Sequence, residues 1–225
     1  MWWRSASFTD MNIFTLRVLL EMVFGTIVFL HVTKKNFGAA FAYGLQSLAI
    51  TVVLFTSFIE TGNLSLLFIA LIVLIVKAIL APVFFIRLIR KHELTFSVST
   101  YLNMPLTLII IAILTFVAHS YKFAPLTGIL PANRALLSLA FSSMLLSLFL
   151  LINRKGALSQ IIGILCLENS IVTFTIFAGL EQSPALQLGI IFNILIWLII
   201  ATVFVSMIYK HFGTLDLTTM NSLKD

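Results

Sequence analysis

The chain has 225 residues, of which 60% are hydrophobic and only 10% are charged, with a net charge of +6. A soluble domain could not cover its surface with so few charges, so the composition excludes an ordinary soluble protein and indicates a membrane protein. A spanning helix needs about 20 largely apolar residues, and runs of that length follow one another along most of the chain.

The apolar runs predict seven transmembrane helices, joined mostly by tight turns. In chain order they are residues 12–33, 37–59, 64–86, 100–118, 131–152, 157–180 and 184–209. Two longer connections interrupt the series, at residues 87–99 and 120–130. The second separates a four-helix part, residues 1–130, from a three-helix part with a short tail, residues 131–225. We therefore expect an all-α integral membrane bundle without a sizeable extramembrane domain.

Basic residues are divided unevenly between the two ends of the predicted bundle. Nine lie in one set of alternate loops and in the tail, and three lie in the opposite set. The nine are Lys34, Lys35, Arg87, Arg90, Lys91, Arg154, Lys155, Lys210 and Lys224, and the three are Arg4, Lys122 and Arg134. Because basic loops tend to stay in the cytoplasm, this pattern predicts an outside N-terminus and a cytoplasmic C-terminus. Short loops offer no basic face for nucleic acid, so we expect the lipid bilayer as a partner and no nucleic acid.

The first predicted helix carries a pair of opposite charges, Arg17 and Glu21. Residues four apart share a helix face, so these two side chains can pair. Arg17 lies near the start of the run, shallow enough for its guanidinium to reach the lipid headgroups. We interpret the two residues as a structural ion pair or a headgroup anchor rather than as a transport site.

Lys77 is a cation deep in the third predicted helix, where neither membrane surface is within easy reach. Pro82 follows five residues later and lacks the amide that would bond the carbonyl of Ala78, so we expect a helix kink there. Freed carbonyls are tolerated in membranes only where protein or water satisfies them. Lys77 therefore indicates either a hydrated, polar interior or a lysine that holds helices together by pairing with a carboxylate.

Glu168 is an acid at similar depth in the sixth predicted helix. Thr175 falls on nearly the same face two turns further on, whereas Asn169 points away by about 100° and is expected to bond a neighbouring helix. A carboxyl group at this depth is typical of a proton relay, although a neutral or paired glutamate can also hold helices together. We expect Glu168, Lys77 and Thr175 to lie on a proton path.

The remaining polar residues of the predicted helices carry weaker signals. Asn193 in the last helix either extends the hydrated path or bonds across a helix contact, whereas Gln46 and Asn103 are expected to make ordinary structural hydrogen bonds. The lone Cys166 and the four histidines, which fall at helix ends or in loops, lack the spacing of metal or cluster ligands. We therefore expect no cofactor and no metal ion.

Three separated motifs resemble the hydrogenase-4 component E family. Residues 153–169 (NRKGALSQIIGILCLEN) resemble its signature, in which a basic turn leads into a helix bearing Gly…Leu-x-Glu-Asn. Residues 75–82 (IVKAILAP) resemble its Thr-Lys-x-x-x-x-Pro helix, and residues 211–224 (HFGTLDLTTMNSLK) resemble its closing Gly-Thr-Leu-Asp segment. The three C-terminal helices are in turn similar to subunit K of respiratory complex I and to the corresponding three-helix component of multisubunit sodium/proton antiporters.

The resemblance implies that Glu168 corresponds to a membrane glutamate on the proton path of complex I. It also implies a bacterial inner membrane, neighbouring antiporter-like membrane subunits, and a hydrogenase or other oxidoreductase arm. Subunit K has a second glutamate in its next helix, whereas residues 191–197 of this chain (IFNILIW) contain no acid. We expect Lys77 or a residue of a partner to take that place.

These features together predict a non-redox, multi-pass subunit of a hydrogenase-4-type, complex-I-like assembly that contributes to proton or cation translocation through Glu168. The chain would itself catalyse no redox step, because it offers no cluster or flavin ligands. Two alternatives stay open. One is a structural anchor for the antiporter-like subunit, and the other is a component of an antiporter or inorganic-carbon uptake complex without an electron-transfer arm.

Overall fold

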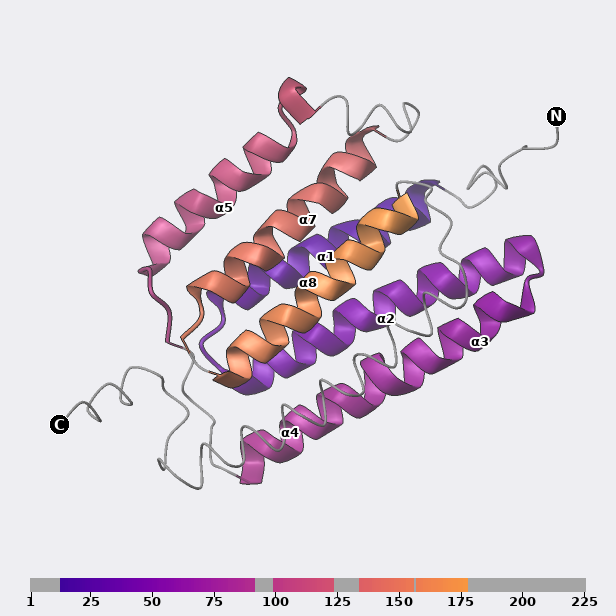
Figure 1. The fold of residues 1–225 in the computed structure, drawn as a ribbon, viewed down its shortest axis with the longest axis horizontal. Helices are drawn as coiled ribbons and strands as arrows, with labels where there is room; N and C mark the ends of the chain where they lie inside the picture. Colours follow the sequence, from indigo (N-terminus) through magenta and orange to yellow (C-terminus); the bar gives the residue numbers. More distant parts are fainter. Residues whose placement is uncertain (1–12, 92–98, 124–133, 156, 178–225) are drawn as a thin grey trace.

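The computed structural model describes residues 13–91, 99–123, 134–155 and 157–177 of the chain (Figure 1). Apart from one isolated β-bridge, every regular element in these ranges is a helix. The elements are α1 (Ile13–Val32), α2 (Asn36–Thr61), α3 (Leu64–Val73), the π-helix η1 (Leu74–Leu80), α4 (Ala81–Lys91), α5 (Met104–Ala118), the short 3-10 helix η2 (Tyr121–Phe123), α7 (Arg134–Asn153) and α8 (Ala157–Phe177). The prediction of an all-α protein is confirmed for the described residues.

Five helical segments of the described part are long and apolar enough to cross a membrane. They are Thr15–Val32, Asn36–Ile59, Leu64–Arg90, Arg134–Asn153 and Leu158–Thr175. They match the first, second, third, fifth and sixth predicted spans, in agreement with a helical membrane protein. The fourth predicted span corresponds to α5, an apolar helix of 15 residues. The seventh, at residues 184–209, lies outside the described residues, as do Asn193 and the tail motif.

Helix α5 begins at Met104, later than the apolar run that predicted it. Asn103 caps the helix, because its side chain accepts a hydrogen bond from the amide of Leu106 at 3.1 Å. The residues before Asn103 use their backbone elsewhere, since the amide of Tyr101 donates to the carbonyl of Asn153 at 3.0 Å. The cap and this contact with the end of α7 explain why the helix is shorter than predicted.

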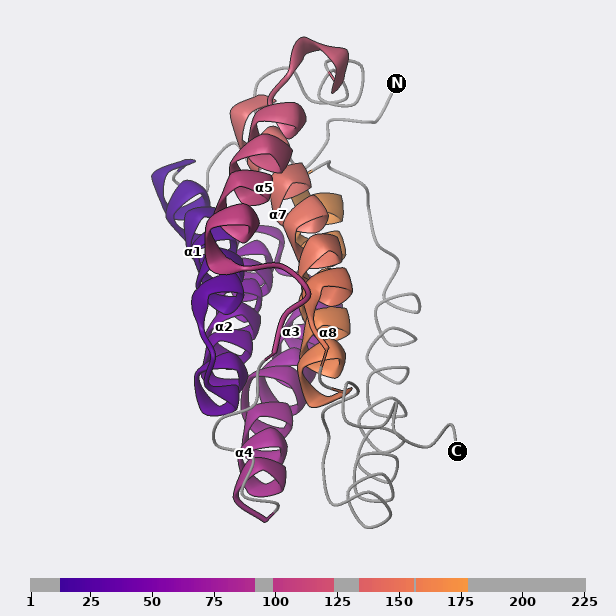
Figure 2. The ribbon, with the colours of Figure 1, turned by 90° about the vertical axis from the view of Figure 1, so that its left-hand side faces the viewer.

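The described helices pack as neighbours around two central elements. Helix α7 packs against α1, α5 and α8, and α2 packs against α1, α8 and the continuous segment α3–η1–α4. Figure 1 shows α5 at one edge of the bundle and α3–η1–α4 at the other. In the view of Figure 2, α1 and α2 lie on one side and α7 and α8 on the other. Helices from both predicted parts therefore pack directly together, and the division at residue 130 stays a prediction.

The basic turns of the described helices gather at one end of the bundle. Arg154, between α7 and α8, is buried and donates from Nη2 to the carbonyl of Thr33 at 3.3 Å, beside the turn between α1 and α2. Burial lowers the pKa of Arg154 to about 10. Lys155 lies over the ring of Tyr101, with Nζ 4.9 Å from the ring centroid. The basic C-terminal half of α4 shares a hydrophobic cluster with the ends of α1, α2 and α8 that lie here.

Candidate functional site

Lys77 lies in the π-helix η1, at the middle of the candidate span Leu64–Arg90. The residue is 3% exposed, so protein encloses its ammonium group. The wider winding of η1 ends at Ala81, whose N–H bonds the carbonyl of Val76. Pro82, one residue later, has no N–H with which to continue the pattern. Lys77 therefore belongs to an irregular stretch of helix, of a type that is frequent at functional sites.

The ammonium group of Lys77 contacts two neighbouring residues of α8. Its Nζ donates to Oε1 of Glu168 at 3.2 Å and to Oδ1 of Asn169 at 3.0 Å. The Glu168 side chain is 24% exposed, whereas that of Lys77 is 3% exposed. A buried charge without a partner is costly, so the carboxylate and the amide stabilise the lysine at this depth.

Asn169 extends this contact to α2. Its Nδ2 donates to Oε1 of Gln46 at 3.2 Å and to Oγ of Ser47 at 3.0 Å. Asn169, Gln46 and Ser47 are each 0% exposed. A polar cluster thus forms inside the bundle where η1, α2 and α8 meet. We name it the Lys77 cluster, and its members are Lys77, Glu168, Asn169, Gln46 and Ser47.

The sequence singles out Lys77 and Glu168 and leaves open whether they pair. It also predicts that Asn169 bonds a neighbouring helix, and the bonds to α2 agree with that prediction. The contact between Asn169 and Lys77 is missed, because helical periodicity turns Asn169 away from Glu168. A lysine side chain is long enough to reach both residues. Gln46 and Ser47 are also missed, although two adjacent polar residues in an apolar helix are a usable signal.

The other residues predicted on the path or as supports lie outside this cluster. Thr175 lies two turns beyond Glu168 on α8, and its hydroxyl donates to the carbonyl of Val172 at 2.8 Å. On α1, Arg17 Nε lies 2.8 Å from Oε1 of Glu21, with side chains that are 67% and 52% exposed. The pair predicted from spacing therefore exists as an exposed contact, remote from the enclosed lysine.

Contacts between α7 and α8 hold Glu168 in place from the other side. Oγ of Ser147 lies 2.7 Å from Oγ of Ser170, and both residues are 0% exposed. Gly163 allows close approach, because a Cβ built there would stand 3.2 Å from Cα of Leu151. Cys166, on the same helix, is a buried thiol that packs in the hydrophobic core. These small side chains fix α8 tightly against α7.

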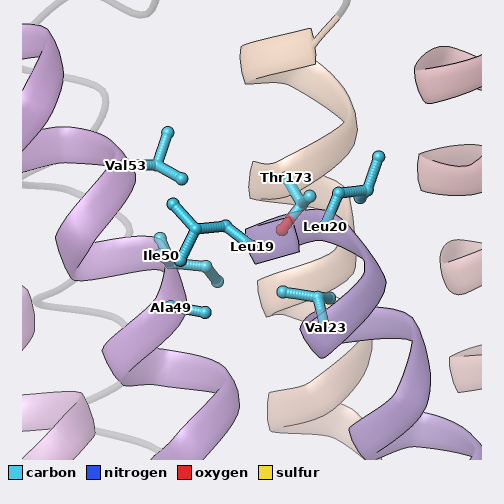
Figure 3. Close-up of a pocket in the computed structure, with 7 residues that line it drawn as sticks. All are labelled: Leu19, Leu20, Val23, Ala49, Ile50, Val53 and Thr173. Carbon is cyan, nitrogen blue, oxygen red and sulfur yellow. The ribbon is translucent and has the colours of Figure 1, made fainter. Parts of the chain in front are cut away.

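A small apolar cavity lies between α1, α2 and α8 (Figure 3). Leu19 and Val23 of α1 and Ile50 of α2 are among its lining residues. Thr173 of α8 also lines it, but its hydroxyl already donates to the carbonyl of Asn169 at 2.7 Å. Within the described ranges, no group of three His, Cys, Asp or Glu residues could hold a metal ion. The polar chemistry of the described part is therefore concentrated in the Lys77 cluster.

No protein family model, no curated protein and no solved structure matches this chain. The resemblance to hydrogenase-4 component E accordingly stays a prediction that rests on three motifs. Two of those motifs meet in the fold, since residues 75–82 supply Lys77 and residues 153–169 supply Glu168 and Asn169.

Proposed function

We propose that this chain is a non-redox membrane subunit that contributes to proton or cation translocation through Glu168, in a hydrogenase-4-type, complex-I-like assembly. The contact between Lys77 and Glu168 near the middle of two membrane-spanning helices carries the proposal. Charged groups at this depth cost roughly 2.5–3.5 kcal/mol each on insertion scales, and they usually mark ion or proton pathways.

The pair can hold one proton in either of two arrangements. With the proton on Lys77 the groups form an ion pair, and with the proton on Glu168 both groups are neutral. The net charge is the same in both arrangements, so the transfer creates no unpaired buried charge. A second proton that arrives at Glu168 leaves the Lys77 ammonium without its counter-charge, which favours the release of one proton. The pair thus has the chemistry of a relay that takes up one proton and releases one.

The unequal exposure of the two groups gives this relay two distinct sides. Glu168 keeps 24% of its side chain open at the surface of α8, whereas Lys77 is enclosed and bonded to Asn169. A proton would therefore reach Glu168 from the open side and pass inward to the Lys77 cluster. We place an antiporter-like subunit against the open side, where it would complete the path.

The proposal includes seven spans, an outside N-terminus, a cytoplasmic C-terminus and a bacterial inner membrane. The clustering of the basic turns at one end of the described bundle supports this orientation, because basic residues collect on the cytoplasmic side. The partners are antiporter-like membrane subunits and a hydrogenase or other oxidoreductase arm, as the family resemblance implies.

The same contacts support a second candidate, a structural anchor. Lys77, Glu168 and Asn169 tie η1, α2 and α8 together across segments that are far apart in the chain. Polar contacts of this kind stabilise helix association in membranes without any ion movement. Under this candidate, ions would pass through a partner protein of the assembly.

Substitution of Glu168 separates the two candidates. Glu168→Gln keeps an oxygen that can accept from Lys77 but cannot carry the proton. We expect native membrane vesicles with this variant to contain the assembled complex and to lose most of their coupled proton pumping. Glu21→Gln, in the exposed pair on α1, is the matched control and should pump normally.

Normal pumping by assembled Glu168→Gln complex would reject the relay. Lys77→Ala provides a second comparison, because it removes the cation and leaves the carboxylate. We expect it to lower pumping at least as much as Glu168→Gln. Loss of assembly in Lys77→Ala, together with normal pumping in Glu168→Gln, would favour the anchor.

A further inference from the structure

Two hydrogen-bonding groups of α2 lie beside the Lys77 cluster without a partner in the described structure. They are Nε2 of Gln46 and the hydroxyl of Tyr43. Both residues are 0% exposed, so no outside group reaches them. A buried polar group left without a hydrogen bond costs about 1–3 kcal/mol, so two such groups together call for an explanation.

The charge of Lys77 fixes which end of the Gln46 amide is left over. An ammonium group only donates, so the atom of Asn169 that faces Lys77 must be its oxygen, Oδ1. The Nδ2 group of Asn169 then faces Gln46, which must present its own oxygen in return. Turning the Gln46 amide over would bring two NH₂ groups together. Nε2 of Gln46 is therefore a donor that points away from the cluster toward a missing acceptor.

The hydroxyl of Tyr43 lies on the same side of α2. Tyr43 and Gln46 are three positions apart, so their side chains share one helix face. The Tyr43 ring packs against Phe85 at 6.2 Å between centroids, within the core cluster that also contains Cys166 of α8. Its hydroxyl lies near Ser47 but outside hydrogen-bonding geometry. Both groups therefore border the junction of α2, α4 and α8.

We propose that Gln46 Nε2 and the Tyr43 hydroxyl bind one internal water molecule beside the Lys77 cluster. A water oxygen accepts from the Gln46 amide and exchanges a hydrogen bond with the tyrosine, which gives it the two or more partners that buried waters have. An anion fits less well, because Glu168 already balances the charge of Lys77. The site itself is independent of the proposed function, and its part in proton transfer rests on that function.

Water transfer to the Gln46 side chain tests the site directly. The full-length chain, with ¹⁵N-labelled glutamine side chains, is reconstituted in phosphatidylethanolamine–phosphatidylglycerol liposomes and studied by water-edited solid-state NMR. We expect magnetisation to pass from water to the Gln46 amide. Gln46→Met removes and thereby assigns that signal. Gln160, half-buried at the basic end, is the positive control.

Tyr43→Phe removes the second ligand by deleting one oxygen atom. We expect loss of the water transfer to Gln46, with unchanged chemical shifts for the other glutamines as evidence of an intact fold. Tyr101→Phe, at an exposed tyrosine, should leave the transfer intact. No transfer to Gln46 in the unmodified chain, or equal transfer in Tyr43→Phe, would overturn the proposal. Because this readout does not involve pumping, it stands or fails separately from the relay.

Discussion

Gly44 of α2 lies against the ring of Pro82: a Cβ built on Gly44 would stand 2.9 Å from Cγ of the proline. The same Cβ would stand 3.6 Å from the carbonyl oxygen of Ala78, the carbonyl that the missing proline amide would otherwise bond. A residue without a side chain thus lets α2 approach the helix at its irregular turn. Because Lys77 belongs to that turn, this approach sets its distance from Gln46 and Ser47.

Gly44→Ala is expected to destabilise the bundle and to disturb the Lys77 cluster. The added methyl group overlaps the Pro82 ring, and overpacking of this kind costs about 1–3 kcal/mol. The unfolding midpoint of the purified chain in mixed micelles with increasing SDS measures the change. Gly25→Ala on α1 is the matched control, because its Cβ meets nothing within 4 Å.

The two glycines should respond in opposite ways. Alanine is favoured over glycine inside a helix by roughly 0.5–1 kcal/mol, so Gly25→Ala should be neutral or slightly stabilising. Equal midpoints for the two variants would mean that the contact between Gly44 and Pro82 does not limit the approach of α2.

Much of the fold is predictable because membrane helices follow from apolar length. The runs at residues 37–59 and 64–86 match α2 and the continuous segment α3–η1–α4 closely. The start of α5 is less predictable, since residues 100–102 are apolar enough to be helical but bond the turn after α7 instead. The π-helical winding of η1 is not predictable from hydropathy, which does not distinguish it from an α-helix.

The site is predictable as a set of residues but not as a set of contacts. The depth of Lys77 and Glu168 follows from counting residues along two runs, whereas their pairing joins positions 91 residues apart. Helical periodicity places Glu168 and Asn169 on different faces of α8, yet Lys77 bonds both. Gln46 gains its importance only from the packing of α2 against α8.

A double-mutant cycle of Lys77→Met and Glu168→Gln is expected to reveal strong coupling. Glu168→Gln should cost more stability than Lys77→Met, because it leaves a cation at 3% exposure, whereas the remaining carboxylate is 24% exposed and can take up a proton. The double variant should lose less than the two single variants combined. We expect a coupling energy of about 0.5–3 kcal/mol in SDS unfolding of the purified chain.

Arg17→Met and Glu21→Gln on α1 form the comparison cycle. These side chains are 67% and 52% exposed and lie four residues apart on one helix, so their coupling should be only about 0.2–0.5 kcal/mol. If both cycles gave the same small value, the contact between Lys77 and Glu168 would be no stronger than an exposed pair.

Asn153, at the end of α7, is expected to hold the start of α5. Its Oδ1 accepts from the amide of Leu102 at 3.0 Å, its Nδ2 donates to Oγ1 of Thr107 at 3.3 Å, and the residue is 3% exposed. Asn153→Leu removes both side-chain bonds. A loss of about 1 kcal/mol in local stability should raise hydrogen exchange of the Leu102 amide about fivefold in the full-length chain in liposomes.

Asn103→Ala distinguishes this clamp from general fraying of α5. The Asn103 side chain caps the helix by accepting from the amide of Leu106, so its removal should speed exchange at Leu106 and leave Leu102 protected. Asn153→Leu should show the reverse pattern, because its acceptor serves Leu102. Faster exchange at both amides in both variants would mean that α5 opens as one unit and that Asn153 has no separate role in docking it onto α7.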